Sequence, residues 1–211
     1  MGVEDKLKLP EPNLKGKLSF EEAVKRRRSV RDFSPEAVSL QDLSQILWAA
    51  QGITGEGDFG RSCPSAGALY PLEIFVAVRK VERLKAGVYQ YDVFQHELEL
   101  IARGDRSEQL AEACLSQLFV AEAPISFIIG VDYSRITWRY GERGIRYVHF
   151  EVGHCGQNIC LQATALGLGA VPIGAFWDKQ VKEVVSIPEN LDPLYVISVG
   201  YPRKEKSGRF S

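Results

Sequence analysis

The feature that most restricts the fold of this chain is one long stretch of helical periodicity, from about Ile145 to Leu166. Its apolar side chains follow one another at intervals of three or four residues, at Val148, Val152, Cys155, Ile159, Ala163 and Leu166. This spacing puts them on one stripe of a single long helix. Gly153 and Gly156 lie inside it, although glycine destabilises a helix interior by about 1 kcal/mol. Glycine is tolerated where another backbone or a flat ligand approaches closely, so we expect this helix to be central and to lie at an interface.

The composition is that of an ordinary globular protein of one domain. The chain has 211 residues, of which 45% are hydrophobic and 25% charged, which is enough for a substantial core. Lysine and arginine number 26 against 27 aspartate and glutamate residues, so the formal net charge is -1. A dedicated nucleic-acid-binding protein normally carries a basic excess. The charge balance therefore argues against nucleic acid as a partner.

Neither a membrane segment nor a metal site is expected. No apolar run approaches the length of a membrane span, and the stretch from Met1 to Ser19 is charged, unlike a signal peptide. His149 and His154 are five residues apart, which does not place two imidazoles on one helical face. No zinc or disulfide spacing is present among the cysteines, which are Cys63, Cys114, Cys155 and Cys160. We therefore expect a cytoplasmic protein with reduced thiols, no metal ion and no membrane partner.

The elements expected along the chain do not alternate regularly between helix and strand. Residues 1–18 are expected to form an extended arm, 19–206 a single domain and 207–211 a tail. Capping patterns predict helices from Ser19 to about Arg28, from Ser39 to Gly52, and after Ser107 and Asp178. Apolar runs predict strands at Leu72–Val78, Gly87–Tyr91, Glu97–Ile101, Ile125–Val131, Ala170–Phe176 and Leu194–Val199. This order favours an α+β fold over a doubly wound sheet.

Three stretches are candidates for binding a ligand. The first, Arg26–Phe33, carries Arg27, Arg28, Ser29 and Arg31 directly after the first helix. Guanidinium groups match phosphate oxygens, so this stretch is either an anion clamp for a phosphorylated cofactor or a solvated basic turn. The second, Cys63–Pro71, is a turn of small residues that could place backbone N–H groups against a ligand. The third, Gly169–Phe176, exposes backbone amides after the long helix.

Taken together and in this order, the three stretches resemble the FMN-dependent nitroreductase family. Residues 27–33, Arg-Arg-Ser-Val-Arg-Asp-Phe, match its opening signature Arg-Arg-Ser-x-Arg-x-Phe. The Pro-Ser-Ala-Gly-Ala-Leu-Tyr-Pro turn at 64–71 is similar to the branch of azoline (thiazole- and oxazole-forming) dehydrogenases, the SagB-type proteins. The ends of the long helix and of the last strand, at 165–174 and 199–202, also match. The resemblance covers residues 19–206.

The resemblance implies a nitroreductase-like fold with a central mixed or antiparallel sheet flanked by helices. It further implies a homodimer formed through the long central helix, with FMN at the subunit interface. Arg27, Arg28, Ser29 and Arg31 would hold the FMN phosphate and ribityl chain. The partner subunit's turn would reach the flavin through Pro64, Ser65, Ala66 and Gly67. The flavin ring would lie along Pro172, Ile173, Gly174 and Ala175. The basic residue that completes the phosphate site would be one of Arg203, Lys206 and Arg209.

Two positions depart from the family pattern. Nitroreductases often have a glutamate after the Pro-Ile pair, where this chain has Gly174. The azoline-oxidising branch has a Lys-Tyr pair before the long helix, and this chain has Arg139-Tyr140. Arginine stays protonated, so Arg139 would be a poor proton acceptor where lysine could serve. Tyr140 either donates a proton or packs as an aromatic side chain.

The sequence therefore predicts an FMN-dependent oxidoreductase. It would transfer hydride from NADH or NADPH to a small electrophile such as a nitro compound or quinone, or oxidise a bound substrate, with Arg139 and Tyr140 as candidate catalytic residues. A non-catalytic flavin- or nucleotide-binding protein on the same fold is the alternative. Nucleic-acid contact through the basic stretch is a third hypothesis, which the charge balance disfavours.

Overall fold

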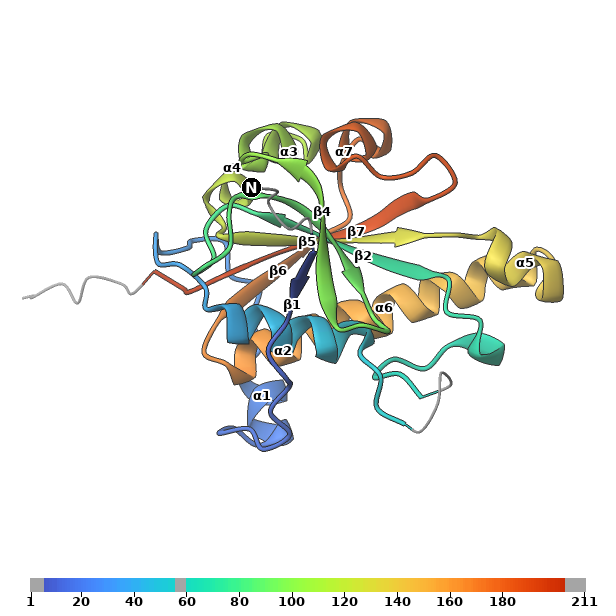
Figure 1. Ribbon diagram of the computed structural model, residues 1–211, viewed down its shortest axis with the longest axis horizontal. Coiled ribbons are helices and arrows are strands. Elements are labelled where there is room, and N and C mark those ends of the chain that lie inside the picture. The colour runs from blue at the N-terminus through green and yellow to red at the C-terminus, as the bar shows by residue number, and fades with distance from the viewer. Residues whose placement is uncertain (1–5, 56–59, 204–211) are drawn as a thin grey trace, which may run out of the picture.

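The computed structural model describes residues 6–55 and 60–203, and these residues form one antiparallel sheet of seven strands (Figure 1). The strands lie in the order β1-β4-β3-β2-β5-β7-β6, and every neighbouring pair is antiparallel. Their bounds are β1 Lys6–Lys8, β2 Leu72–Val78, β3 Gly87–Asp92, β4 Glu97–Arg103, β5 Ile125–Val131, β6 Gly169–Ile173 and β7 Asp192–Gly200. The α+β class is confirmed, and the sheet is antiparallel throughout rather than mixed.

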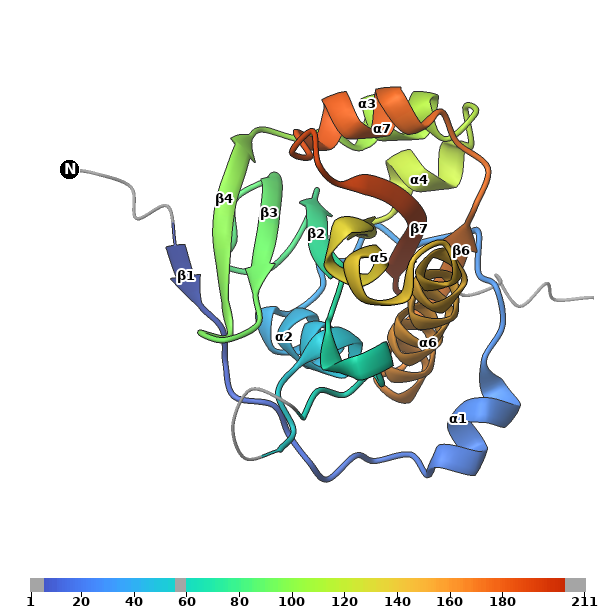
Figure 2. The same cartoon turned by 90° about the vertical axis from the view of Figure 1, so that its right-hand side faces the viewer.

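Helices cover both faces of the sheet (Figure 2). One face carries α1 Phe20–Arg26, α2 Leu40–Gln51 and α6 Arg143–Ala165, with α5 Ser134–Tyr140 leading into α6. The opposite face carries α3 Ser107–Ala113, α4 Leu118–Glu122 and α7 Asp178–Val185. A short 3-10 turn, Ala66–Ala68, connects the loop after α2 to β2. The molecule is therefore a three-layer arrangement with the sheet in the middle.

The central strands are apolar on both faces because both faces are covered. In β2, Ile74 and Val76 belong to the core beneath α2 and α6. Phe75 and Ala77 point the other way, into the core beneath α3 and α7. Successive side chains of a strand point to opposite faces, so a strand buried on both sides becomes a continuous apolar run. This is why β2 and β5 were predictable to the residue.

Helix α6 has the expected length and packs differently around its two glycines. At Gly156 an added Cβ would lie 3.0 Å from the ring of Tyr195, so the missing side chain allows the helix to approach β7 closely. At Gly153 an added Cβ would meet nothing within 4 Å, because this glycine is on the outer, exposed side of the helix. One glycine thus serves internal packing and the other leaves the outer face flat.

Of the four predicted helix starts, the two serine caps are confirmed, α3 begins at Ser107 as predicted, and one predicted cap is wrong. The Ser19 hydroxyl accepts a hydrogen bond from Glu22 N at 3.2 Å, and Ser39 accepts one from Asp42 N at 3.0 Å. Asp178 does not cap α7. The cap position is Trp177, and Asp178 is the first helical residue, where its charge favours the helix N-terminus instead. Helices α4 and α5 were not predicted, because neither has a capping side chain or a long apolar stripe.

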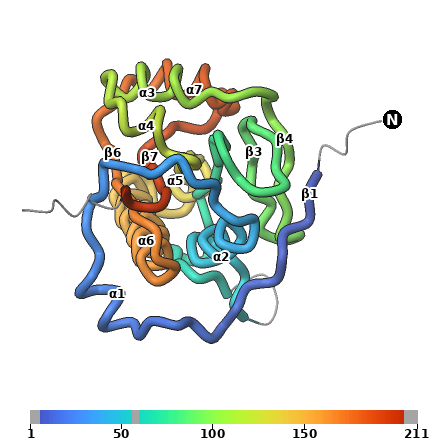
Figure 3. The backbone as a smooth tube through the Cα atoms, turned by 90° about the vertical axis from the view of Figure 1, so that its left-hand side faces the viewer, coloured from blue at the N-terminus to red at the C-terminus, as the bar shows by residue number. Residues whose placement is uncertain are grey.

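The segment before α1 is fixed to the molecule over part of its length (Figure 3). Strand β1 pairs with β4, and Leu9 is buried against the core beneath α2. His96 fastens the next residue: its Nε2 lies 3.0 Å from Pro10 O and 2.8 Å from Ser44 Oγ. Its Nδ1 lies 2.8 Å from the Tyr91 hydroxyl. The expected extended arm thus contributes an edge strand and a core side chain.

Candidate functional site

The arginine segment, Arg26–Phe33, lies against the start of β6. Ser29 forms a parallel bridge with Ala170, and Val30 N donates to Ala170 O at 3.1 Å. A Cβ added at Gly169 would come within 2.6 Å of the Val30 side chain, so only glycine permits this approach. Two of the three stretches singled out in the sequence are therefore neighbours in the fold.

The side chains of the arginine segment are arranged so that most of them face solvent. Arg26 pairs with Glu22, one turn back on α1. Arg28 Nη1 donates to Lys25 O at 2.9 Å and to Arg27 O at 2.7 Å, which holds its guanidinium at the end of the helix. Arg28, Ser29 and Arg31 are exposed, and Arg27 is half-buried. Arg26 is thus committed to its own helix, whereas the following residues are accessible to an anion.

One of the three candidate C-terminal basic residues lies beside the arginine segment. Arg203 N donates to Asp32 O at 3.0 Å, and its side chain donates to Asp32 Oδ1 at 2.6 Å and to Phe33 O at 3.0 Å. Lys206 and Arg209 lie outside the described residues. Arg203 therefore joins the segment through a carboxylate, which fixes its guanidinium in place.

The end of β6 completes this first half-site, which we define as Arg27, Arg28, Ser29, Arg31, Arg203 and residues 172–175. Ile173 is buried and Pro172 half-buried, but Gly174 and Ala175 are exposed. A Cβ at Gly174 would meet no atom within 4 Å. Gln117 Nε2 donates to Ala175 O at 3.3 Å and so orients the backbone there. The half-site offers guanidinium groups and a hydroxyl at one end and accessible backbone at the other.

The second stretch, Cys63–Pro71, meets the Arg139-Tyr140 pair and forms a second half-site, Pro64–Gly67 with Arg139 and Tyr140. Gly67 has a φ of 63°, and a Cβ there would lie 2.7 Å from the Tyr140 hydroxyl and 3.1 Å from Arg139 Nη1. The Tyr140 ring packs edge-on against Tyr147 at 5.3 Å between centroids. The turn and the candidate catalytic pair, 72 residues apart or more in sequence, are thus in contact.

The two half-sites lie at opposite ends of α6. Tyr140 precedes the first residue of the helix, and Gly169 follows its last turn. A helix of 23 residues is about 35 Å long at 1.5 Å per residue. Figure 1 shows α5 at one end of α6, with α1 and β6 at the other. Within the described residues, a single chain does not bring the two half-sites together.

The outer face of α6 and its surroundings carry exposed apolar side chains. Phe150 is 55% exposed and Ile145 41%, both on α6, and Trp138 of α5 is 72% exposed. Phe20 at the start of α1 is 69% exposed. A groove of about 390 Å³ lies between α1, α2 and α6, with Leu14, Phe20 and Trp48 among its lining residues. An exposed apolar band of this kind is typical of an interaction surface.

Sequence reasoning missed one buried acidic residue of α6. Glu151 is 2% exposed, and neither carboxylate oxygen has a well-formed hydrogen bond among the described residues. Burial raises the pKa of this carboxyl to about 7, although the facing Ser65 hydroxyl and the Arg61 guanidinium each lower it. Its position, three residues after Val148 and four before Cys155, is on the apolar stripe of the helix. A carboxylate on the apolar stripe of a helix was the sequence signal that could have identified this residue.

Replacing Glu151 with glutamine should raise the free energy of unfolding at about pH 8 by up to about 3 kcal/mol. The unfolded carboxyl ionises near its ordinary value of 4.5, whereas the folded one stays neutral until about 7. The native protein therefore loses stability as the pH rises between these two values, and the glutamine variant does not. Below the lower value, where both states are protonated, the two proteins should be equally stable. Urea unfolding across this range checks the prediction, with the exposed Glu183→Gln change on α7 as the control.

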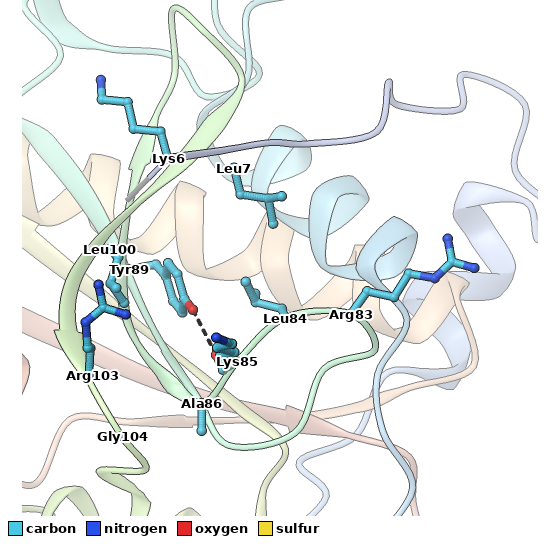
Figure 4. Close-up of a pocket in the computed structure, with 10 residues that line it drawn as sticks. All are labelled: Lys6, Leu7, Arg83, Leu84, Lys85, Ala86, Tyr89, Leu100, Arg103 and Gly104. Atoms are coloured by element: carbon cyan, nitrogen blue, oxygen red, sulfur yellow. Dashed lines mark hydrogen bonds between the residues drawn. The ribbon is translucent and has the colours of Figure 1, made fainter. Parts of the chain in front are cut away.

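Two further cavities among the described residues lie away from the half-sites. Figure 4 shows a cavity of about 320 Å³ beside β1, lined by apolar side chains such as Leu84 and Tyr89 and by basic ones such as Arg83. A second cavity, also about 320 Å³, is lined by polar residues that include Arg61, Glu73 and Arg135.

Among the residues that the structure describes, no helix is long and apolar enough to cross a membrane. The same residues contain no group of three or more metal-ligating side chains.

A seven-stranded antiparallel sheet with helices on both faces and a long central helix defines a nitroreductase-like α+β fold. The sequence profile described as "Nitroreductase family" matches residues 24–201. The chain belongs to the nitroreductase family and is therefore an oxidoreductase by class.

Relatives of known sequence span two kinds of protein. The chain is 44% identical over 196 residues to a Methanocaldococcus jannaschii protein named "Putative nitroreductase MJ1384", covering 93% of this chain and 97% of that one. It is 25% identical over 185 residues to the microcin B17-processing protein McbC of Escherichia coli, covering 80% of this chain and 64% of McbC. The chain thus corresponds to only part of McbC.

Solved structures support the same assignment. A crystal structure described as a "putative nitroreductase" from Ralstonia eutropha matches with a TM-score of 0.83 and 27% identity, covering 97% of this chain and 93% of that one. An NADPH:FMN oxidoreductase from Vibrio harveyi, complexed with NAD+, matches with a TM-score of 0.64 and 20% identity, covering 88% and 69%. At 20% identity, the similarity to the Vibrio harveyi protein shows a shared fold only.

Proposed function

We propose that the protein is an FMN-dependent oxidoreductase that takes hydride from NADH or NADPH. It passes the hydride to a small electrophilic acceptor such as a nitro compound or a quinone, or oxidises a bound substrate. The observation that carries the proposal is the contact between the arginine segment and β6 through Ser29 and Ala170. That contact supports the proposal because it puts guanidinium side chains beside an exposed strand end, where a flat ring could lie.

The chemical groups of these residues suit FMN, which has an anionic phosphate and a flat ring. Arg27, Arg28, Ser29 and Arg31 would hold the phosphate and ribityl chain through charge-assisted hydrogen bonds, with Arg203 held nearby by Asp32. Bound FMN would supply the acceptance and donation of hydride. Exposed backbone at Gly174 and Ala175 would lie along the ring, and its N–H groups would stabilise negative charge there without loss of side-chain entropy. Lys206 and Arg209 remain proposed alternatives for the phosphate.

We further propose that the protein is a homodimer in which two α6 helices pack antiparallel. Antiparallel packing would place the second half-site of one chain, Pro64–Gly67 with Arg139 and Tyr140, next to the first half-site of the other. A two-fold axis makes this happen twice, so the dimer would hold two FMN molecules at its interface. The flat surface at Gly153 and the exposed Phe150 support this helix as the contact.

We also propose the domain bounds and the cellular compartment of the protein. Residues 19–206 would form a single FMN-binding domain that is preceded by the arm, residues 1–18, and followed by a short tail, residues 207–211. The described cysteines are all free and buried, which supports a reducing compartment, the cytoplasm.

Replacing Arg28 with alanine should weaken FMN retention at least about tenfold, because a charge-assisted hydrogen bond contributes about 1.5–3 kcal/mol. The matched change Arg26→Ala should leave retention unchanged, since Arg26 pairs with Glu22 on α1. Equilibrium dialysis of FMN against the two variants measures the difference. Equal effects of the two changes on retention would return the segment to the alternative of a solvated basic turn.

Colour and anaerobic reduction test the proposal itself. The purified protein, incubated with FMN, should show a bound flavin spectrum, and NADH or NADPH should bleach it rapidly without oxygen. A protein that binds no flavin would refute the proposal. Binding without reduction by either donor would favour the second candidate, a non-catalytic flavin-binding protein. The observation that favours this candidate is Arg139, which replaces the lysine of the azoline-oxidising branch and stays protonated.

A further inference from the structure

All the unpartnered buried polar side-chain atoms among the described residues belong to four neighbouring residues. They are Gln51 Nε2, Arg61 Nε, Ser62 Oγ and both carboxylate oxygens of Glu151. Arg61 Nη1 donates to Gln51 Oε1 at 3.3 Å, and the Arg61 charge acts on Glu151. Native proteins leave few buried polar groups unsatisfied, and each one requires an explanation such as bound water or a catalytic role. Ser62 follows Arg61 in the chain, so the four residues form one buried polar cluster.

This polar cluster lies between a polar cavity and the turn of the second half-site. On one side, Arg61 also lines the polar cavity of about 320 Å³ and stacks over the Tyr70 ring at 4.2 Å. On the other side, the Ser65 hydroxyl faces Glu151 and belongs to the Pro64–Gly67 turn. Ser65 Oγ accepts a hydrogen bond from Tyr70 N at 2.9 Å, so its own proton remains available for donation. Glu151 and Ser65 therefore form a polar route from the side of the cavity, beside Arg61, to the turn.

We propose that Glu151 is the buried proton donor and acceptor of this oxidoreductase and that it acts through the Ser65 hydroxyl. The inference rests on the proposed function. Reduction of an acceptor by hydride adds two electrons and one proton, and the product needs one further proton to be neutral. Ser65 gives that proton and takes one from Glu151, whose carboxylate regains it from water in the cavity. In the direction of substrate oxidation, the same steps run in reverse.

None of the charged and titratable groups described around Glu151 is as well suited to donate and accept a proton near neutral pH. Arg61, on the loop after α2, stays protonated and stabilises the carboxylate once it forms. Cys155 on α6 faces Glu151, but the hydrogen bond with Cys63, followed by burial, holds the pKa of its thiol well above the usual value. Glu151 is the carboxyl that faces the turn within the described part of the chain, and burial places its pKa near neutrality, where a general acid works best.

The test compares Glu151→Gln with Ser65→Ala and uses Glu183→Gln, on α7, as the matched control. Glu151→Gln and Glu183→Gln should bind FMN like the unaltered protein, and the rates of all three variants are compared per bound FMN. Glu151→Gln should slow NAD(P)H-dependent acceptor reduction about a hundredfold and should flatten its pH profile across the neutral range. Ser65→Ala should slow it similarly. A structural role alone would leave the pH profile unchanged in the glutamine variant.

A second measurement needs neither flavin nor turnover. Infrared spectra of the flavin-free protein should contain the band of a protonated buried carboxylic acid that disappears on raising the pH through neutrality. This band should be absent from Glu151→Gln and present in Ser65→Ala. Full activity with an unchanged pH profile in Glu151→Gln, or a Glu151 carboxyl already ionised in mildly acidic solution, would overturn the inference while leaving the proposed function intact. Failure of the unaltered protein to bind FMN would instead refute the proposed function, and this inference with it.

Discussion

Replacing Phe150 with aspartate should convert the protein from a dimer to a monomer and remove its bound FMN at the same time. Phe150 is 55% exposed on the outer face of α6, beside the open surface at Gly153. A charge left unpaired in a buried interface costs about 3–5 kcal/mol, and two-fold symmetry introduces it twice. Because each proposed FMN site needs both chains, loss of the dimer should abolish both sites. Sedimentation and the flavin absorbance of the same sample measure the two effects.

The control for this change is Leu115→Asp. Leu115 is 48% exposed and follows α3 on the opposite side of the sheet. Its left-handed backbone, with a φ of 58°, is one that aspartate tolerates better than most residues. This variant should remain dimeric and keep its flavin. A monomeric Phe150→Asp protein that still holds a full complement of FMN would contradict the shared site.

Mixing two inactive variants should restore about a quarter of the FMN sites, because half of randomly paired dimers are mixed and each mixed dimer has one intact site. The variants are Arg28→Ala, which damages the first half-site, and Gly67→Val, which damages the second. At Gly67 the backbone φ of 63° and the Tyr140 hydroxyl, 2.7 Å from an added Cβ, both exclude a branched side chain. Each variant alone should bind little FMN.

The measurement is FMN content after the two variants are unfolded together and refolded, compared with each variant refolded alone. Recovery requires that the two half-sites of one FMN come from different chains. If each chain built a complete site by itself, mixing would restore nothing. A recovery close to one half would also contradict the arrangement, since it would require both sites of a mixed dimer to work.

Much of the fold was predictable because most elements carry their own signal. Strands Leu72–Val78 and Ile125–Val131 match their predicted bounds, since both are apolar runs buried on both faces. The long helix, predicted from about Ile145 to Leu166, spans Arg143–Ala165. Strand β1 was missed because three residues with alternating lysines are too short to show a period. Its strand character comes from pairing with β4, which is a tertiary effect.

The candidate site was predictable in its parts but not in its arrangement. The sequence identified the arginine segment, the turn at Pro64–Gly67 and the Arg139-Tyr140 pair as separate features. That the turn contacts Tyr140, while the arginine segment lies a helix length away, depends on how α6 crosses the sheet. Glu151 was missed for a different reason. Its unusual property is burial, and the signal for it was the apolar stripe of the long helix, on which position 151 lies.

The fixed segment before α1 has a practical consequence for anyone who wishes to attach something to this protein. Leu9 and the Pro10 carbonyl are held by the core and by His96, so residues 6–10 are part of the folded body. Removing the residues before the family match, which begins at residue 24, would uncover the edge of β4. His96 would also lose its contact with the Pro10 carbonyl, which helps to hold it against Ser44 and Tyr91. An uncovered strand edge invites pairing with other chains. A fluorescent or affinity partner should therefore be joined ahead of β1 with those residues retained.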